Sequence, residues 1–238
     1  MSDERRSELA ANLERVRGRI TAAAEAAGRD PAELTLVVVT KTYPASDVAL
    51  LAELGVTDVG ENRHPEAGRK RDEAAEAGAR LRWHFVGGLQ TNKANAVTRY
   101  ADAVHSVDRL RLVTALESGA AAAGRRIDAY VQVNLEGRDD EPAGRAGAAP
   151  ADVRSVADAI ASAEHLRLAG VMTVAPLDAD PDDAFARLSE VAAEVRAEHP
   201  GAVAISAGMS GDLEQAVAHG ATHVRIGRSV LGERPALG

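Results

Sequence analysis

Cysteine is absent from this chain of 238 residues, and aromatic residues are scarce, at 3 % of the sequence. The lack of cysteine excludes disulfide bonds, thiolate metal sites and a cysteine nucleophile. The lack of aromatic residues leaves Val, Leu, Ile and Ala to supply most of the core volume. No stretch approaches the roughly 20 apolar residues of a membrane span, and the polar N-terminus has no apolar signal core. We therefore expect a cytoplasmic protein with no membrane association.

Positive charge is also in short supply. Lys and Arg number 28 against 36 Asp and Glu, which gives a formal net charge of -8 at pH 7. A general nucleic-acid-binding protein needs a broad basic surface, so we expect no nucleic-acid partner. The histidines are scattered without the spacing of metal ligands, and we expect no metal site.

What the sequence does contain is an alternation of short apolar runs with amphipathic segments. The apolar residues of Asp3–Ala27 recur at spacings of three and four, which predicts a long first helix. Strands are expected at Leu34–Lys41, Thr57–Asn62, Arg82–Gly87, Ala103–Val107, Ala129–Asn134, Arg167–Val174, Ala202–Ala207 and His223–Gly227. Further helices are expected near Ser46–Leu54, Pro65–Gly78, Thr91–Arg99, Arg109–Ala123, Ala151–Ala163, Pro181–Glu198 and Asp212–Ala218, with a short one after Gly227.

Eight strands that are nearly all followed by a helix predict an α/β protein with a parallel sheet. In a chain of this length we expect a closed (β/α)8 barrel of the TIM type, in a single domain over residues 1–238. An open doubly wound sheet is the alternative, but no Gly-x-Gly-x-x-Gly turn follows the first strand. The segment Glu136–Pro150 lacks periodicity, and we expect a loop that acts as a lid or binding loop, or a solvated loop with no role.

Lys41 closes the first predicted strand and is the most informative residue. Burial disfavours the charged form of an amine, and a neutral amine attacks aldehydes. Our hypothesis is that Lys41 holds pyridoxal phosphate as a Schiff base. The alternative is a strand-end lysine whose ammonium reaches into water.

Polar residues end most of the predicted strands, at the face where barrels of this type carry their active sites. The loops after the seventh and eighth strands commonly bind phosphate. The short segment Ser210-Gly211-Asp212 also fits a turn and helix cap, and the two roles are compatible. Candidate residues for this anion are Ser206, Gly208, Gly227, Arg228 and Ser229, and Met209 and Ser210 of the same loop are further candidates for binding the cofactor.

Three further residues complete the candidate cofactor site. A buried Arg225 needs a partner, either a barrel carboxylate or the pyridine nitrogen of a pyridoxal ring. An arginine at that nitrogen weakens the ring as an electron sink, which favours racemase-like or carrier behaviour over transamination. Asn62 would orient the ring hydroxyl of a cofactor or cap the next helix. We include His84 in the site, although a hydrogen-bonded histidine of the core or rim is a more common role than acid/base catalysis.

Together these segments resemble the pyridoxal phosphate homeostasis proteins, relatives of the alanine racemase barrel. The resemblance implies that pyridoxal 5'-phosphate is the cofactor and that Lys41 carries its aldimine. It also implies that Arg225 lies at the pyridine nitrogen, and that Ser206 holds the phosphate together with the Gly227 and Arg228 backbone. The matching segments are Thr40-Lys41-Thr42-Tyr43-Pro44-Ala45, Gly60-Glu61-Asn62, Trp83-His84-Phe85-Val86-Gly87-Gly88-Leu89-Gln90-Thr91-Asn92-Lys93, Gly170-Val171-Met172, Ser206-Ala207-Gly208-Met209-Ser210-Gly211-Asp212 and Val224-Arg225-Ile226-Gly227.

The chain departs from this family in three places. Arg63-His64-Pro65-Glu66 replaces the aromatic residue and Val-Gln-Glu that usually follow Gly-Glu-Asn. Arg145 stands near a position that often carries lysine, and a guanidinium cannot form an aldimine. Arg228 replaces a Thr or Ser, which removes a hydroxyl contact but keeps the backbone N–H.

The resemblance leaves two functions open. The first is a carrier or regulator without catalysis that holds pyridoxal phosphate and passes it to apo-enzymes. The second is an amino-acid racemase, which needs two bases on opposite faces of the substrate carbon. Racemases of this kind take a tyrosine from a C-terminal β-domain that also makes their dimer. Because the sequence ends at Gly238, we expect no such domain, a non-catalytic role and a monomer. A sugar-phosphate isomerase barrel lacks a well-placed Glu base here and explains Lys41 less well.

Overall fold

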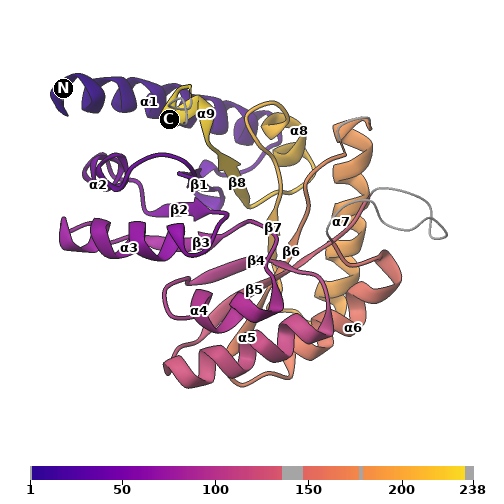
Figure 1. The fold of residues 1–238 in the computed structure, drawn as a ribbon. Coiled ribbons are helices and arrows are strands. Elements are labelled where there is room, and N and C mark those ends of the chain that lie inside the picture. Colours follow the sequence, from indigo (N-terminus) through magenta and orange to yellow (C-terminus); the bar gives the residue numbers. More distant parts are fainter. Residues whose placement is uncertain (1, 136–146, 177–178, 234–238) are drawn as a thin grey trace.

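The computed structural model describes residues 2–135, 147–176 and 179–233. Within them, eight parallel strands close into a barrel in chain order, from β1 to β8 (Figure 1). β8 pairs with β1 and completes the ring. The predicted (β/α)8 barrel is therefore confirmed, and the open doubly wound sheet is wrong.

Each strand of the barrel is followed along the chain by a helix. The strands are β1 (Thr35–Val39), β2 (Asp58–Glu61), β3 (Arg82–Phe85), β4 (Ala103–Val107), β5 (Ile127–Gln132), β6 (Leu166–Met172), β7 (Ala204–Ser206) and β8 (His223–Ile226). The helices are α1 (Ser2–Ala26), α2 (Ala45–Glu53), α3 (Glu66–Glu76), α4 (Ala94–Val97), α5 (Leu110–Ala123), α6 (Pro150–Ala161), α7 (Pro181–Glu198), α8 (Leu213–Ala218) and α9 (Arg228–Leu231), with 3-10 turns η1 (Pro31–Glu33) and η2 (Thr91–Lys93).

Helix α1 covers one side of the barrel, next to α8 and α9 (Figure 1). The apolar stripe predicted from its sequence is buried in a cluster with residues of β1, β2, β8 and α9. Full burial of each large aliphatic side chain contributes about 1.5–3 kcal/mol, so this stripe fixes α1 to the barrel. The buried residues of the stripe are Leu9, Leu13, Val16 and Ile20.

The first predicted strand is too long at its carboxyl end. Lys41 lies in the turn that follows β1, not within the strand. Thr42 has a φ of 72°, which no continuing strand adopts, and the Tyr43 N–H turns back to donate to the Thr40 carbonyl at 3.1 Å. The turn conformation, which the β-prone composition does not reveal, ends the strand.

Most other strands also end one or two residues before their predicted limits, so Asn62, Gly87 and Gly227 lie in loops. Ladder hydrogen bonds need a neighbour in register, and β-propensity does not report where that neighbour ends. The predicted helix Thr91–Arg99 is instead the turn η2 followed by the short α4. Most of the predicted loop Glu136–Pro150, including Arg145, lies outside the described residues, and its last residue begins α6.

The barrel interior is filled by small and polar side chains. Barrels of this type usually stack branched aliphatic residues in layers. Here Ala103, Ala169 and Ala204 surround Tyr130 and Met172 in a small interior cluster. The remaining interior volume contains histidine, serine, arginine and aspartate side chains, which lead to the candidate site.

Candidate cofactor site

Lys41 stands in a strained turn at the open, C-terminal end of the strands, which we call the mouth of the barrel. Its side chain is partly exposed. The next residue, Thr42, has a φ of 72°, in the left-handed region that β-branched residues rarely adopt. Strain of this kind persists only where the surroundings hold it, and it gathers at functional sites. The backbone therefore marks this turn independently of the sequence pattern.

A buried ion pair holds the backbone on one side of the turn, and a partly exposed carboxylate holds it on the other side. Lys70 Nζ donates to Glu61 Oε1 at 2.6 Å and to the Thr40 carbonyl at 2.9 Å. The Thr40 hydroxyl donates to the same Glu61 oxygen at 2.7 Å. Burial raises the pKa of Glu61, and the nearby Lys70 ammonium opposes that rise. On the other side, Glu66 Oε1 accepts the Thr42 N–H at 3.3 Å.

A chain of five polar side chains runs through the barrel interior below the mouth. Arg225 Nη1 lies 2.6 Å from Ser206 Oγ, which lies 2.9 Å from His105 Nδ1. His105 Nε2 lies 2.8 Å from His84 Nδ1, and His84 Nε2 lies 2.7 Å from Asp58 Oδ1. We call this set the polar chain. It places His84 inside the barrel, 1 % exposed, and not at the mouth.

One assignment of protons satisfies every link of the polar chain. Arg225 donates to Ser206, whose hydroxyl donates to His105 Nδ1. His105 then donates from Nε2 to His84 Nδ1, and His84 donates from Nε2 to the Asp58 carboxylate. Reversing the middle links leaves the Ser206 hydroxyl hydrogen without an acceptor among the described residues. Burial, reinforced by the neighbouring cations, holds the pKa of His105 well below its usual range, as this assignment requires.

The two ends of the polar chain carry opposite charges. Burial opposes ionisation of Asp58, but hydrogen bonds from His84 and Thr57 lower its pKa below the ordinary value. At the other end, burial lowers the pKa of Arg225 to about 10, so the guanidinium stays charged at neutral pH. The chain thus runs from a cation near the mouth to an anion near the N-terminal end of β2.

Arg225 is a buried cation that makes no direct ion pair within the described residues, although Asp212 lies near enough to favour its charge. Its guanidinium is 5 % exposed and donates to Ser206 Oγ at 2.6 Å and to the Thr173 carbonyl at 2.7 Å. Among the described residues no carboxylate lies in salt-bridge contact with it. Of the two partners expected from the sequence, a barrel carboxylate therefore makes no direct contact with Arg225 within the described residues. Ser206 itself is fully buried, and its hydroxyl is engaged by Arg225 and His105.

The loop after β7 folds back onto the barrel wall. Gly208 has a φ of 91°, and its carbonyl accepts the Arg225 N–H at 2.9 Å. The Met209 N–H donates to Asp212 Oδ1 at 2.5 Å, while the Met209 side chain is 39 % exposed. Ser210 is partly buried beside it. This loop is therefore fixed in part by the backbone of the residue that supplies the buried guanidinium.

Three predicted site residues follow neighbouring strands. Lys41, Asn62 and Gly227 come after β1, β2 and β8, and β1 pairs with both of the others. Arg228 begins α9 and is exposed. Gly87 packs so closely on the Asn62 backbone that an added Cβ would lie 2.3 Å from the Asn62 carbonyl oxygen. The barrel closure therefore brings these residues into one sector of the mouth.

Comparison with known proteins identifies the family. The family described as alanine racemase, N-terminal domain, matches residues 9–235. A pyridoxal phosphate homeostasis protein of Mycobacterium tuberculosis is 46 % identical over an alignment of 245 positions that covers 97 % of this chain and 95 % of the relative. This chain belongs to the pyridoxal phosphate homeostasis protein family.

Solved structures place this family member among barrels of the same kind. PipY of Synechococcus elongatus, solved with PLP bound, superimposes with a TM-score of 0.81 at 31 % identity and covers 94 % of this chain and 100 % of its own. Alanine racemase of Corynebacterium glutamicum superimposes with a TM-score of 0.67 at 18 % identity. This chain covers 62 % of that racemase, and the likeness shows a shared fold alone.

The residues at the mouth of this pyridoxal phosphate homeostasis family member fit the cofactor of the family name. That molecule carries an aldehyde, a basic ring nitrogen and a phosphate. Lys41 offers an amine, and Arg225 is a buried cation with two of its five N–H groups engaged within the described residues. A guanidinium that is held by neutral oxygens matches a neutral ring nitrogen, because no carboxylate of the described residues is in contact with it.

One departure from the family pattern has a clear structural place. His64 stacks on Tyr100, with ring centroids 6.0 Å apart and planes inclined by 11°. Burial lowers the pKa of His64, with a further contribution from Lys93. Its neighbour Arg63 is exposed. The altered segment, which forms the loop after β2, therefore packs through His64 against the residues before β4.

Sequence reasoning missed most of the polar interior. His105 and His223 each occupy an alternate position of an apolar strand, which was the available signal. Tyr130 stacks on His105 at a centroid distance of 4.1 Å, and its hydroxyl lies 3.3 Å from His223 Nε2. Burial, with His84 nearby, lowers the pKa of His223 to about 4.

The described residues contain no cluster of three or more His, Asp or Glu arranged to hold a metal ion. No helix in the described part of the chain combines the length and apolar character needed to cross a membrane.

Proposed function

We propose that this chain binds pyridoxal 5'-phosphate as a Schiff base on Lys41 and acts as a carrier or regulator of the cofactor without catalysis. The observation that carries the proposal is the buried Arg225, which lacks an ion-pair partner within the described residues. It lies on β8 beside Val37 of β1, the strand that leads to Lys41. The name of the M. tuberculosis relative and the PLP-bound PipY structure support this proposal.

Each residue then has a defined task. Pyridoxal phosphate supplies an aldehyde that condenses with an amine with loss of water, and a ring that withdraws electrons. Lys41 supplies the amine, and Arg225 donates an N–H to the ring nitrogen, which keeps that nitrogen unprotonated. We assign Asn62 to the ring hydroxyl, and the Gly227 and Arg228 backbone to the phosphate. We expected Ser206 at the phosphate, but its hydroxyl is engaged by Arg225 and His105, so we now propose that Ser206 and His84 act through Arg225.

The tyrosines favour a carrier over a racemase. A racemase needs a second base opposite the lysine, and all three tyrosines of this chain lie among the described residues. The Tyr43 hydroxyl donates to the Gly232 carbonyl at 2.7 Å, and Tyr130 meets His223 inside the barrel. Tyr100 is 7 % exposed, and burial raises its pKa. A buried or engaged phenol is poorly suited to remove a proton from a substrate at the mouth.

The carrier role also defines the partners. A partly exposed Lys41 is accessible to competing amines, so we propose that the cofactor passes to apo-enzymes that depend on it. The absence of cysteine fits a cytoplasmic setting, which we propose together with a monomeric state.

Chemical trapping tests the attachment site sharply, because the chain contains only three lysines, Lys41, Lys70 and Lys93. We expect an absorbance band after addition of pyridoxal phosphate that disappears on borohydride reduction and leaves one pyridoxyl group on the Lys41 peptide. Lys41→Ala should lose both the band and the label. Lys93→Ala is the matched control, because Lys93 is exposed, and it should keep both.

Label on Lys93 or the N-terminal amine at equal yield in Lys41→Ala would overturn the assignment. The same loaded protein, incubated with L-alanine and analysed on a chiral column, separates the two functions. We expect no D-alanine above the protein-free control, and steady turnover would favour the racemase.

A further inference from the structure

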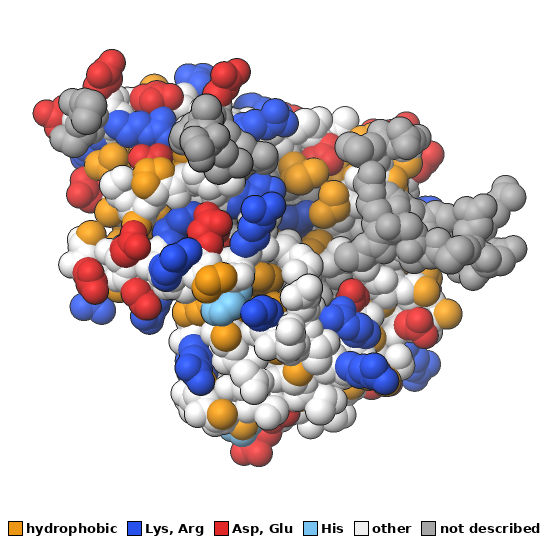
Figure 2. All heavy atoms as spheres, in the orientation of Figure 1, with side chains coloured by type: hydrophobic (Ala, Val, Ile, Leu, Met, Phe, Trp, Pro, Cys, Tyr) orange, Lys and Arg blue, Asp and Glu red, His pale blue; other side chains and the backbone are white. Residues whose placement is uncertain are grey.

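The N-terminal end of the barrel, opposite the mouth, has a large pocket lined by arginine. Its volume is about 800 Å³, and it lies between α3 and the starts of β3 to β6. Five arginines and two aspartates line it, an excess of three positive charges. The chain as a whole carries a net charge of -8, and acidic and basic side chains alternate over the face in Figure 2. The pocket is therefore a positive site on an acidic protein.

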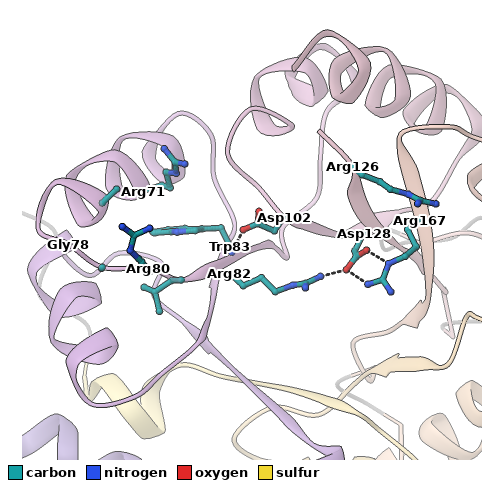
Figure 3. A pocket seen from close by; sticks show the side chains of 12 residues that line it. Arg71, Gly78, Arg80, Arg82, Trp83, Asp102, Arg126, Asp128 and Arg167 are labelled. Carbon is teal, nitrogen blue, oxygen red and sulfur yellow. Dashed lines mark hydrogen bonds and ion pairs between the residues drawn. The ribbon is translucent and has the colours of Figure 1, made fainter. Parts of the chain in front are cut away.

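Part of this charge has a structural explanation. Asp128 binds Arg82 and accepts two hydrogen bonds of 2.5 Å from Arg167 (Figure 3). These contacts join β3, β5 and β6 at the floor of the pocket. Asp102 accepts the Trp83 N–H at 2.8 Å and is also paired with Arg125. Both lining aspartates are therefore already engaged, and neither neutralises the remaining arginines.

Arg80 and Arg126 have no such explanation. Within the described residues neither makes a hydrogen bond or an ion pair, and both are exposed. Arg80 lies with Arg71 at one end of the pocket, and Arg126 lies near Arg167 at the other (Figure 3). Arg71 has only an exposed contact with the adjacent Asp72. Unengaged guanidinium forks at both ends of one pocket match an occupant with an anionic group at each end.

We propose that this pocket binds a small, elongated dianionic molecule, whose two phosphate or carboxylate groups contact Arg80 and Arg126. The volume suits a ligand of metabolite size. Arg82 and Arg167 add positive potential at the floor without leaving their bonds to Asp128. The proposal is independent of the cofactor at the mouth.

Calorimetric titration of the full chain, in the presence of saturating pyridoxal phosphate, tests this site. The probes are hexanediol bisphosphate, adipate as the dicarboxylate, and hexyl phosphate as a matched single anion. We expect one bisphosphate per chain, bound about tenfold more tightly than hexyl phosphate. Comparison of adipate with the bisphosphate decides between the two anion chemistries: tighter binding of adipate favours carboxylate groups, and tighter binding of the bisphosphate favours phosphate groups.

The variant Arg80→Ala/Arg126→Ala should weaken bisphosphate binding by about tenfold or more, with an unchanged unfolding midpoint, because neither side chain supports the fold. Arg154→Ala is the control, since this arginine is exposed on α6 and its loss changes the net charge in the same sense. Equal bisphosphate affinity in the wild type and the double variant would overturn the proposal. So would an equal loss in Arg154→Ala.

Discussion

At the scale of single residues, the position of Lys41 depends on partners that are not adjacent in sequence. Lys41 could be found from the sequence because it closes an apolar, β-prone run. The support from Lys70 and Glu61 could not, because their pairing depends on how α3 packs against β2. Glu61 belongs to a recognisable motif, but its pairing with Lys70 appears only once the helix is placed. The sequence thus singled out Lys41 as the proposed reactive amine but gave no sign of the ion pair that supports its turn.

The Lys70–Glu61 pair gives the first prediction at this scale. Lys70→Met should destabilise the protein by about 3 kcal/mol, because it leaves a buried carboxylate without its cation. Adding Glu61→Gln in the same chain should recover part of that loss. Urea denaturation measures both, with Lys93→Met at an exposed lysine as the control, expected within about 0.5 kcal/mol of wild type. If Lys70→Met is as stable as this control, the pair has no supporting role.

At the scale of elements, the order and type of strands and helices followed from periodicity, and the ends did not. β4 ends as predicted, while β1 stops before Lys41 because Thr42 adopts a positive φ. Likewise, alternation in β8 gives Arg225 and His223 the same face, but it does not indicate that this face meets His105 inside a closed ring. Closure is a property of all the strands together, so the polar interior was not visible in any one of them.

The loops after β2 and β3 contact each other where Gly87 packs against the Asn62 backbone. Gly87→Ala should destabilise the protein by about 2 kcal/mol, because its Cβ would lie 2.3 Å from the Asn62 carbonyl oxygen. Gly88→Ala is the adjacent control, since nothing lies within 4 Å of its added Cβ. Thermal unfolding of both variants provides the measurement. Equal melting temperatures would mean that the Asn62 loop is free to shift.

At the scale of the whole molecule, the buried histidines predict how stability depends on pH. In the folded protein the pKa of His223 is lowered to about 4, and that of His105 lies well below the ordinary value of 6.5. Between pH 4 and 6.5 the unfolded chain therefore binds more protons than the folded one. Stability therefore falls as the pH drops from about 6.5 towards 4, by about 1.4 kcal/mol per pH unit for each such histidine. Glu61, whose pKa is raised in the folded protein, opposes this loss of stability at lower pH. His64, whose pKa is lowered, adds to the loss.

Urea denaturation at a series of pH values measures this dependence. His223→Gln should reduce the slope between pH 6.5 and 4 by about 1.4 kcal/mol per unit, because glutamine does not titrate. Parallel curves for wild type and variant would contradict the assignment of a low pKa to His223.

The polar chain has a consequence for how this protein can change over evolutionary time. Each of its three middle members, Ser206, His105 and His84, is bonded on both sides, so replacing one removes a hydrogen bond from each of two buried neighbours. Replacing all five members by apolar residues of similar volume would leave no polar group unpaired, although it would remove the guanidinium that we assign to the cofactor. Intermediate sequences are therefore less stable than either extreme. We expect these positions to be inherited as a block, with substitutions in them strongly epistatic and rarely single.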